Sequence, residues 1–164
     1  MSIPQSVPAS SKVELYAELH VQARALLSGE RDPIANAANI SALVFHTLPD
    51  LNWVGFYWRR GEELVLGPFQ GKPACVRIPI GKGVCGTAAK DKRTVLVPDV
   101  HKFPGHIACD GASRSEIVIP VMRTVEVLGV LDVDSPSLAR FDADDALGLE
   151  ELVNLFLLAT DLGD

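Results

Sequence analysis

The sequence predicts one α+β domain in which helices cover one side of an antiparallel sheet. Three observations support this prediction. The chain of 164 residues is long enough for one domain with a well-buried core. Amphipathic helical patterns occur towards both ends, and short apolar strands joined mostly by turns fill the middle. This order of elements is typical of a sheet with helices packed on one face.

The first part of the chain is predicted to be helical. Residues 1–10 are polar, contain two prolines and are expected to be a flexible arm, which leaves residues 11–164 as the domain. Ser11 and Glu14 have capping-box spacing at the start of a helix that ends near Ser28. The apolar face of this first helix comprises Leu15, Leu19, Ala23, Leu26 and Leu27.

A second helix begins at Asp32 and Pro33, an N-cap followed by proline at the first helical position. It ends before Pro49. Its apolar stripe comprises Ile34, Ala37, Ile40, Val44 and Leu48. Asp142 is expected to cap a last helix, whose apolar positions are Leu149, Leu152, Val153, Phe156 and Ala159.

Several strands lie between these helices. Residues 52–58 alternate, so Trp53, Gly55 and Tyr57 are expected on one face of the strand, opposite Val54 and its neighbours. A turn and a returning strand at 63–66 complete a hairpin. The remaining predicted elements are a loop at 68–73, a strand at 75–80, a short helix of small residues at 84–89, a strand at 94–97 and a second hairpin formed by 117–121 and 125–133.

The composition disfavours several classes of protein. A formal net charge of −6 argues against binding to nucleic acid, whose phosphates attract basic surfaces. No apolar run approaches the roughly 18 residues of a membrane span, and the N-terminus lacks the basic start and apolar core of a signal peptide. We therefore expect a cytoplasmic protein that binds neither membranes nor nucleic acid, in a compartment that keeps thiols reduced.

The three cysteines, Cys75, Cys85 and Cys109, are widely spaced and odd in number, which disfavours a framework of structural disulfides. The sequence has no C-x-x-C pair, so neither a zinc ribbon nor a thioredoxin motif fits. A zinc site that uses His101 or His106 is a minor alternative, because closed zinc sites usually contain a tight ligand pair. We expect no metal.

Residues 103–120, FPGHIACDGASRSEIVIP, are the stretch that most clearly suggests chemistry. Prolines and glycines open the stretch as a loop, and a β-branched run closes it as a buried strand. Cys109 lies in this loop with His106, Asp110 and Glu116 nearby. A thiol held among titratable groups and fixed to a buried strand is typical of a reactive site. The alternative is that Cys109 is a small buried apolar residue in a solvated loop.

Two carboxylates lie close together on a later strand. In Leu131-Asp132-Val133-Asp134 the two acids are two residues apart and therefore point to the same face. Like charges so placed repel each other, so Asp132 within an apolar strand needs a cation, a metal or a proton of its own. This indicates a functional role for Asp132. Asp134 by itself is better explained as a residue that ends the strand and caps a turn.

Two weaker patterns have both structural and functional explanations. Trp53 and Tyr57 share a strand face, as pocket walls often do, although aromatic pairs at this spacing are more often core residues. Gly81-Lys82-Gly83 before a short helix is typical of an anion cradle and equally of a tight turn. The sequence contains no P-loop, dinucleotide fingerprint or serine nucleophile elbow.

Three segments resemble the free methionine-(R)-sulfoxide reductases, which are GAF-fold enzymes. The segments are GPFQGKPACVRIPIGKGVCGTAA (67–89), VPDVHKFPGHIACDGASRSEIVIPV (97–121) and GVLDVDSP (129–136). The resemblance is collinear from about Leu15 to the last helix and includes all three cysteines. It implies an α+β, GAF-like fold with a central antiparallel sheet of about six strands, helices on one face and the ligand pocket on the other. Gly111 departs from the family pattern, in which serine is expected.

The resemblance also implies roles for individual residues. Cys109 is expected to be the nucleophile, Cys75 the main resolving cysteine and Cys85 a further redox-active thiol. The implied reaction reduces free L-methionine (R)-S-oxide to L-methionine, through a sulfenic acid on Cys109 and an intramolecular disulfide that thioredoxin reduces. No prosthetic cofactor is implied. The substrate-binding residues implied by the resemblance are Trp53, Tyr57, Glu116, Asp132 and Asp134.

The chemistry of these residue types agrees with the implied reaction. Crowded carboxylates raise one another's pKa, so one of them can stay protonated as an acid while the others hold the substrate ammonium group. Which carboxylate serves as the acid and which ones bind the ammonium group stays open. Whether the chain forms a homodimer also stays open. We expect Trp53 to pack against the S-methyl group and the turn at Gly81–Gly83 to receive the substrate carboxylate. A GAF binding module that senses a small ligand without catalysis is the alternative function.

Overall fold

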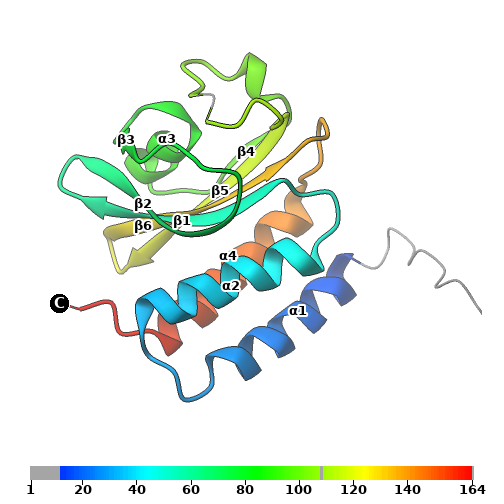
Figure 1. Cartoon of the computed structure of the whole chain (residues 1–164), viewed down its shortest axis with the longest axis vertical. Helices are drawn as coiled ribbons and strands as arrows, with labels where there is room; N and C mark the ends of the chain where they lie inside the picture. Colours follow the sequence, from blue (N-terminus) through cyan, green and yellow to red (C-terminus); the bar gives the residue numbers. More distant parts are fainter. Residues whose placement is uncertain (1–11, 108, 164) are drawn as a thin grey trace, which may run out of the picture.

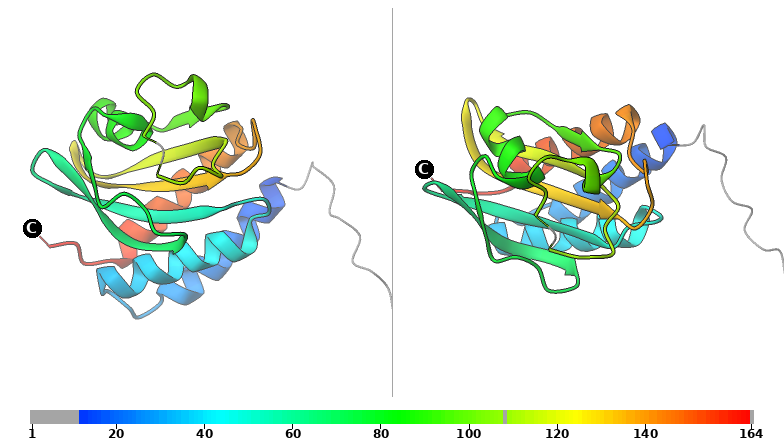
Figure 2. Two further views of the ribbon diagram at one scale, coloured as in Figure 1. Left: turned by 45° about the horizontal axis from the view of Figure 1, so that its top comes forward. Right: turned by 90° about the horizontal axis from the view of Figure 1, so that it is seen from above.

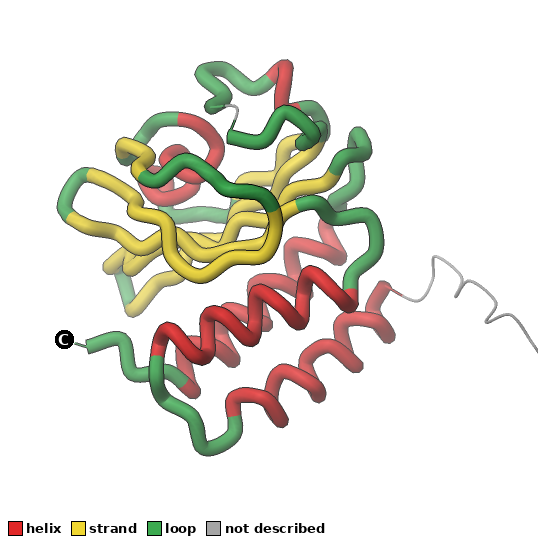
Figure 3. The backbone as a smooth tube through the Cα atoms, viewed as in Figure 1, coloured by secondary structure: helices red, strands yellow, loops and turns green. Residues whose placement is uncertain are grey.

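A six-stranded antiparallel sheet forms the centre of the computed structural model, which describes residues 12–107 and 109–163 (Figures 1 and 3). The strand order is β3 (Arg77–Pro79), β2 (Glu63–Gly71), β1 (Trp53–Arg60), β6 (Glu126–Ser135), β5 (Ser115–Arg123) and β4 (Val95–Val97). The hairpins β1–β2 and β5–β6 meet at the centre, where β1 pairs with β6. The predicted α+β class with an antiparallel sheet is confirmed. The arm predicted at residues 1–10 and the cap predicted at Ser11 lie outside the described residues.

Three helices, α1 (Lys12–Leu27), α2 (Pro33–Thr47) and α4 (Ala143–Ala159), lie on one side of the sheet, which we call the helix face (Figure 2). Asp32 caps α2 by accepting a hydrogen bond from the amide of Ala35 at 2.9 Å. Asp142 and Asp145 form a capping box at the start of α4. Both predicted caps are confirmed, and they begin these helices because they satisfy amides that lack a helical partner.

The core on the helix face buries most of the predicted apolar stripes, with two exceptions. Ile34 is 69% exposed and Leu26 is 43% exposed, so their predicted burial was wrong. Leu26 is adjacent in sequence to the buried Leu27, and successive helical residues point about 100° apart, which turns Leu26 away from the stripe. Ile34 lies in the first turn of α2 and is exposed there, although the later stripe residues of this helix are buried.

The loop predicted at residues 68–73 is largely strand, because β2 continues its pairing with β1 beyond an irregularity between Gly55 and Tyr57. The strand predicted at 75–80 shrinks to the three residues of β3. Cys75 therefore lies in a connecting segment and not in the sheet.

The opposite side of the sheet, which we call the pocket face, is covered by α3 (Gly83–Asp91), the one-turn helix η2 (Val100–Lys102) and the loop that follows it (Figure 1). The predicted alternation in β1 is confirmed. Trp53 and Tyr57 belong to the core on the pocket face, and Val54 and Phe56 belong to the core on the helix face. Within the described ranges, no helix is long and apolar enough to cross a membrane.

Candidate active site

A pocket lies on the pocket face, between the sheet, α3 and loop residues 106, 107, 109, 110 and 113. It lies here because β1, β5 and β6 supply a floor of polar side chains on the face that α1, α2 and α4 leave open. Seven of the eight predicted site residues are among the described residues that line the pocket, and Cys75 is the exception. The pocket is lined by Trp53, Tyr57, Ala74, Ile78, Gly83, Val84, Cys85, His106, Ile107, Cys109, Asp110, Ser113, Glu116, Asp132 and Asp134.

The sheet register brings three carboxylates together on the pocket floor. Glu116 on β5 lies directly opposite Asp134 on β6, and Asp132 is two residues further along the same face. Asp134 is also opposite Trp53 on β1. The three residues are only 6 to 8% exposed. Asp134, for which the sequence favoured a turn-capping role, is thus a buried lining residue.

Burial and mutual repulsion change the ionisation of this carboxylate cluster, which comprises Glu116, Asp132 and Asp134. Burial, followed by the neighbouring carboxylates, raises the pKa of Glu116 and of Asp134 well above the usual range. Burial also raises the pKa of Asp132, to about 6, and the neighbouring Glu116 and Cys85 side chains oppose the rise. Of the three, Asp132 is therefore the carboxyl group that loses its proton most readily.

We expect Glu116→Gln to stabilise the fold at alkaline pH. A carboxyl group whose pKa is 4.5 in the unfolded chain and higher in the folded chain loses its proton first in the unfolded state, so stability falls as pH rises through that interval. Glutamine removes this loss. The variant should exceed the parent in free energy of unfolding at pH 8, and this advantage should be much smaller at pH 5.

Denaturant unfolding of the disulfide form at the two pH values measures this difference. Glu126→Gln, at an exposed position at the start of β6, is the matched control and should show no such pH dependence. Equal stabilisation by Glu116→Gln at both pH values would mean that the carboxyl does not titrate differently in the folded chain.

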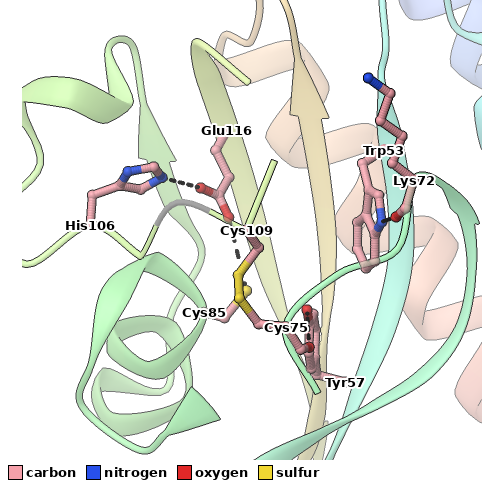
Figure 4. The surroundings of a disulfide bond; sticks show 8 residues. All are labelled: Trp53, Tyr57, Lys72, Cys75, Cys85, His106, Cys109 and Glu116. Carbon is pink, nitrogen blue, oxygen red and sulfur yellow. Dashed lines mark hydrogen bonds and ion pairs between the residues drawn. A yellow bond between two sulfur atoms is a disulfide. The ribbon is translucent and has the colours of Figure 1, made fainter. Parts of the chain in front are cut away.

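The cysteines converge on this pocket from three separate segments (Figure 4). A disulfide joins Cys75 to Cys109, with 5.4 Å between the two Cα atoms. The carbonyl of Cys75 accepts a hydrogen bond from the Tyr57 hydroxyl at 3.0 Å, which ties the segment before β3 to the sheet. Cys85 on α3 is a free, buried thiol, and its Sγ lies 3.9 Å from Oε1 of Glu116. Burial and the nearby carboxylates raise the pKa of Cys85.

An aromatic wall closes one side of the pocket. Trp53 stacks against Tyr57 and Phe69, with ring centroids 5.8 and 5.3 Å apart. Its indole Nε1 donates to the carbonyl of Lys72 at 3.1 Å (Figure 4). Gly55 makes room for this ring, because a Cβ at that position would lie 2.6 Å from Trp53 Cη2. These contacts fix the ring in one orientation.

The loop that carries Cys109 is anchored by Asn52, for which the sequence predicts only a place at the start of a strand. Asn52 Nδ2 donates to Oδ2 of Asp110 and to Oγ of Ser113, both at 3.0 Å, and its amide donates to the carbonyl of Asp134. The neighbours of Asn52 in sequence, which form an aromatic strand, do not predict that its side chain anchors the loop. Gly111 has open space at its Cβ position and no left-handed backbone, so serine would also fit at this position.

Asn52→Ala is expected to loosen this loop in the disulfide form. The substitution removes two side-chain hydrogen bonds, which are together worth about 1–3 kcal/mol. Amide exchange at Ala112 and Ser113 should accelerate by at least roughly tenfold if the loop opens locally. Hydrogen exchange read by mass spectrometry on the peptide that covers 109–115 measures the effect. Asn154→Ala, at an exposed asparagine on α4, is the control; unchanged exchange in Asn52→Ala would contradict the anchoring role.

The two histidines of this region have different surroundings. His106 Nε2 lies 4.0 Å from Oε2 of Glu116, and burial, followed by His101, lowers the pKa of His106, so it is a neutral neighbour of the carboxylate cluster (Figure 4). His101 is exposed and pairs with Asp99. Among the described residues, the group whose ligand atoms lie close enough to hold a metal ion is Cys85, Glu116 and Asp132, and neither histidine belongs to it.

The predicted turn at Gly81–Gly83 leads into α3, whose first turn borders the pocket. Gly83 has a φ of 62°, which favours glycine, and the N-cap Lys82 makes no side-chain capping bond. Gly83, Val84 and Cys85 line the pocket. Amides at the start of a helix lack helical partners, so they favour an anionic group.

The fold and the site together define a GAF-domain protein with a disulfide beside a buried acidic pocket, and a family model described as "GAF domain" matches residues 36–161. The chain is 52% identical to the free methionine-R-sulfoxide reductase of Escherichia coli, covering 87% of each chain. It is 45% identical to the enzyme of that name from Saccharomyces cerevisiae, covering 88% of this chain and 85% of that one. The chain belongs to the free methionine-R-sulfoxide reductase family.

Solved structures agree with this assignment. The free methionine-R-sulfoxide reductase of Neisseria meningitidis, in complex with its substrate, superposes with a TM-score of 0.88 at 46% identity, covering 94% of this chain and 93% of that one. The reduced form of the Staphylococcus aureus protein superposes with a TM-score of 0.86 at 47% identity, covering 97% of this chain and 99% of that one. The implied GAF-like fold is confirmed.

Proposed function

We propose that this chain reduces free L-methionine (R)-S-oxide to L-methionine, with residues 11–164 acting as one catalytic domain. The observation that carries the proposal is the Cys75–Cys109 disulfide at a pocket whose floor holds three buried carboxylates. The names of the relatives support the same substrate. A ligand sensor has no need for a disulfide at its binding pocket, so no feature favours that alternative.

Cys109 acts as the nucleophile in this proposal. Cys109 lines the pocket, and the disulfide places Cys75 within bonding distance of its sulfur. The Cys109 thiolate attacks the sulfoxide sulfur, the oxygen takes a proton and passes to Cys109, and methionine leaves. The sulfenic acid on Cys109 then condenses with the Cys75 thiol, which forms the disulfide and releases water. Sulfoxide and two thiols are thus converted to thioether, disulfide and water.

Glu116 supplies the proton to the sulfoxide oxygen. It lies in the pocket beside the cysteines, and its burial keeps the carboxyl group protonated near neutral pH (Figure 4). A protonated carboxyl group also avoids placing a negative charge beside the attacking thiolate. Cys85, 3.9 Å from Glu116, is close enough to serve as the further redox-active thiol.

Asp132 binds the substrate ammonium group. Its Oδ1 is buried without a hydrogen-bond partner among the described residues, and Asp132 is the member of the carboxylate cluster that loses its proton most readily. Asp134 lies beside it and accepts a second ammonium proton through its carbonyl-type oxygen. A methionine residue within a protein chain has a neutral amide nitrogen in place of this ammonium group, which disfavours it as a substrate in a buried acidic pocket.

The aromatic wall and the start of α3 hold the remaining groups of the substrate. Trp53 packs against the S-methyl group, and Tyr57 supports it by stacking. The amides in the first turn of α3 receive the substrate carboxylate, as expected for an anion at a helix start. Thioredoxin, or a similar dithiol, reduces the disulfide by exchange in a reducing compartment such as the cytoplasm. The scheme uses no prosthetic group, because the dithiol supplies both electrons.

Incubation of the reduced protein with dithiothreitol and each epimer of free methionine sulfoxide tests the function. We expect methionine from the R epimer and none from the S epimer. A peptide that contains methionine (R)-sulfoxide should not be reduced. Turnover of the S epimer alone, or equal turnover of the peptide, would refute the proposed substrate.

A further inference from the structure

Three side chains of the pocket lie close enough together to surround one metal ion. Cys85 comes from α3, Glu116 from β5 and Asp132 from β6, and one ligand atom of each lies within 4.8 Å of the other two. The three residues are 4%, 6% and 6% exposed. The sheet register fixes two of them, because Asp132 pairs with Val118, two residues from Glu116 on the same face of β5.

A second observation indicates that a cation belongs at this cluster. Asp132 Oδ1 is buried and has no hydrogen-bond partner within residues 12–107 and 109–163. Across those residues, no lysine or arginine forms an ion pair with Glu116, Asp132 or Asp134. A buried carboxylate oxygen without a donor is costly unless a ligand supplies the positive charge.

The donor atoms select the chemical class of the cation. One thiolate sulfur and two carboxylate oxygens suit zinc and similar borderline ions, whereas magnesium and calcium prefer oxygen ligands alone. A tetrahedral site with the usual zinc–sulfur and zinc–oxygen distances of about 2.3 and 2.0 Å holds its ligand atoms roughly 3.3–3.5 Å apart, so ligand atoms now separated by up to 4.8 Å must move closer by as much as about 1.5 Å when the ion binds. Three protein ligands leave one tetrahedral position for water.

We propose that Cys85, Glu116 and Asp132 form a reversible binding site for one thiophilic divalent cation, with zinc as the ion that fits best. The cation takes the oxygen of Asp132 that the substrate ammonium needs, so zinc and methionine sulfoxide exclude each other. This exclusion, unlike the metal site, rests on the proposed function. The site therefore makes the enzyme sensitive to inhibition by free zinc.

The disulfide form of the untagged chain allows a direct test, because Cys75 and Cys109 are then unable to bind metal and Cys85 is the remaining thiol. Titration with Co²⁺ should give one bound ion per chain, with thiolate-to-cobalt charge-transfer absorption and the strong visible bands of a tetrahedral site. Zn²⁺ should displace the Co²⁺.

Matched variants assign the ligands. Cys85→Ser should abolish the charge-transfer band and weaken binding by at least roughly tenfold, and Asp132→Asn should weaken binding by a similar factor with the band retained at saturation. His101→Ala removes an exposed histidine that pairs with Asp99, and it should bind as the parent does. Circular dichroism confirms that each variant is folded. Absence of Co²⁺ and Zn²⁺ binding, or parental binding by Cys85→Ser, would overturn the proposal.

The exclusion is tested in a Cys75→Ser, Cys109→Ser double variant, which retains Cys85 and does not turn over substrate by the proposed mechanism. Methionine sulfoxide at saturation should raise the apparent Kd for Co²⁺ by at least roughly tenfold. If sulfoxide binds the metal-free variant but leaves the Kd unchanged, the shared site is refuted. If sulfoxide fails to bind at all, the proposed function and the exclusion fail together, while the titration of the disulfide form still decides the metal site.

Discussion

Cys109→Ser is expected to form no methionine from free methionine (R)-sulfoxide, even in a single turnover. The hydroxyl of serine is far less nucleophilic than a thiolate, and no sulfenic acid can form at this position. The rate of the first turnover should fall by at least roughly 10³-fold. Methionine measured after mixing excess reduced enzyme with sulfoxide checks this, because the amount formed does not then depend on recycling.

Cys75→Ser is the matched control, since it removes the other sulfur of the same disulfide. This variant should release one methionine per enzyme at a rate close to that of the parent and then stop when thioredoxin is the reductant. A disulfide by itself does not distinguish its attacking sulfur from its resolving sulfur. If Cys75→Ser lost the first turnover and Cys109→Ser kept it, the two roles would be reversed.

Asp132→Asn is expected to lower kcat/KM for free methionine sulfoxide by about 10²-fold or more, mainly through a higher KM. Asp132 provides the ionised carboxylate in a pocket where its Oδ1 has no other partner among the described residues. A buried, charge-assisted hydrogen bond to the ammonium group is worth about 2–4 kcal/mol, which corresponds to this factor. Steady-state kinetics with dithiothreitol as the reductant measures the change.

Glu126→Gln provides the control for loss of a carboxylate from the same strand at an exposed position, and it should behave as the parent. N-acetylmethionine sulfoxide, which lacks the ammonium charge, offers a further comparison. The parent should reduce this compound with a low kcat/KM. The Asp132→Asn substitution should lower that kcat/KM little further. A parental KM in Asp132→Asn for the free amino acid would show that the ammonium group binds elsewhere.

The secondary structure was largely predictable because local signals and tertiary packing agree. Asp32 with Pro33 and Asp142 mark helix starts, and the structure uses both caps. The sequence-based predictions are wrong where strand pairing or tertiary packing outweighs the local sequence preference. Pro68 and the glycines around it suggest a loop, yet β2 continues to Gly71 because β1 offers partners up to Trp53. Ile34 fits the apolar stripe of α2 and is nevertheless exposed, and helical periodicity alone does not predict this exposure.

The candidate site was predictable in its chemistry but not in its contacts. The resemblance pointed to eight residues, and the structure brings them together around one pocket. Asn52 was missed as an anchor of the loop, because its partners Asp110 and Ser113 are about sixty residues away in sequence. The cluster of Cys85, Glu116 and Asp132 could likewise be found only once α3 was placed over β5 and β6.

The sequence by itself determined the α+β class, the family resemblance and the kinds of side chain that the site contains. Periodicity and caps depend on neighbours in the chain, so they can be read from the chain. Only the tertiary structure showed that Cys75, the partner that the resemblance implies, is bonded to Cys109, and that the three carboxylates are buried together. The pKa of Asp132 and of Glu116 depends on burial and on charges supplied by different strands, and disulfide pairing depends on distances across the fold.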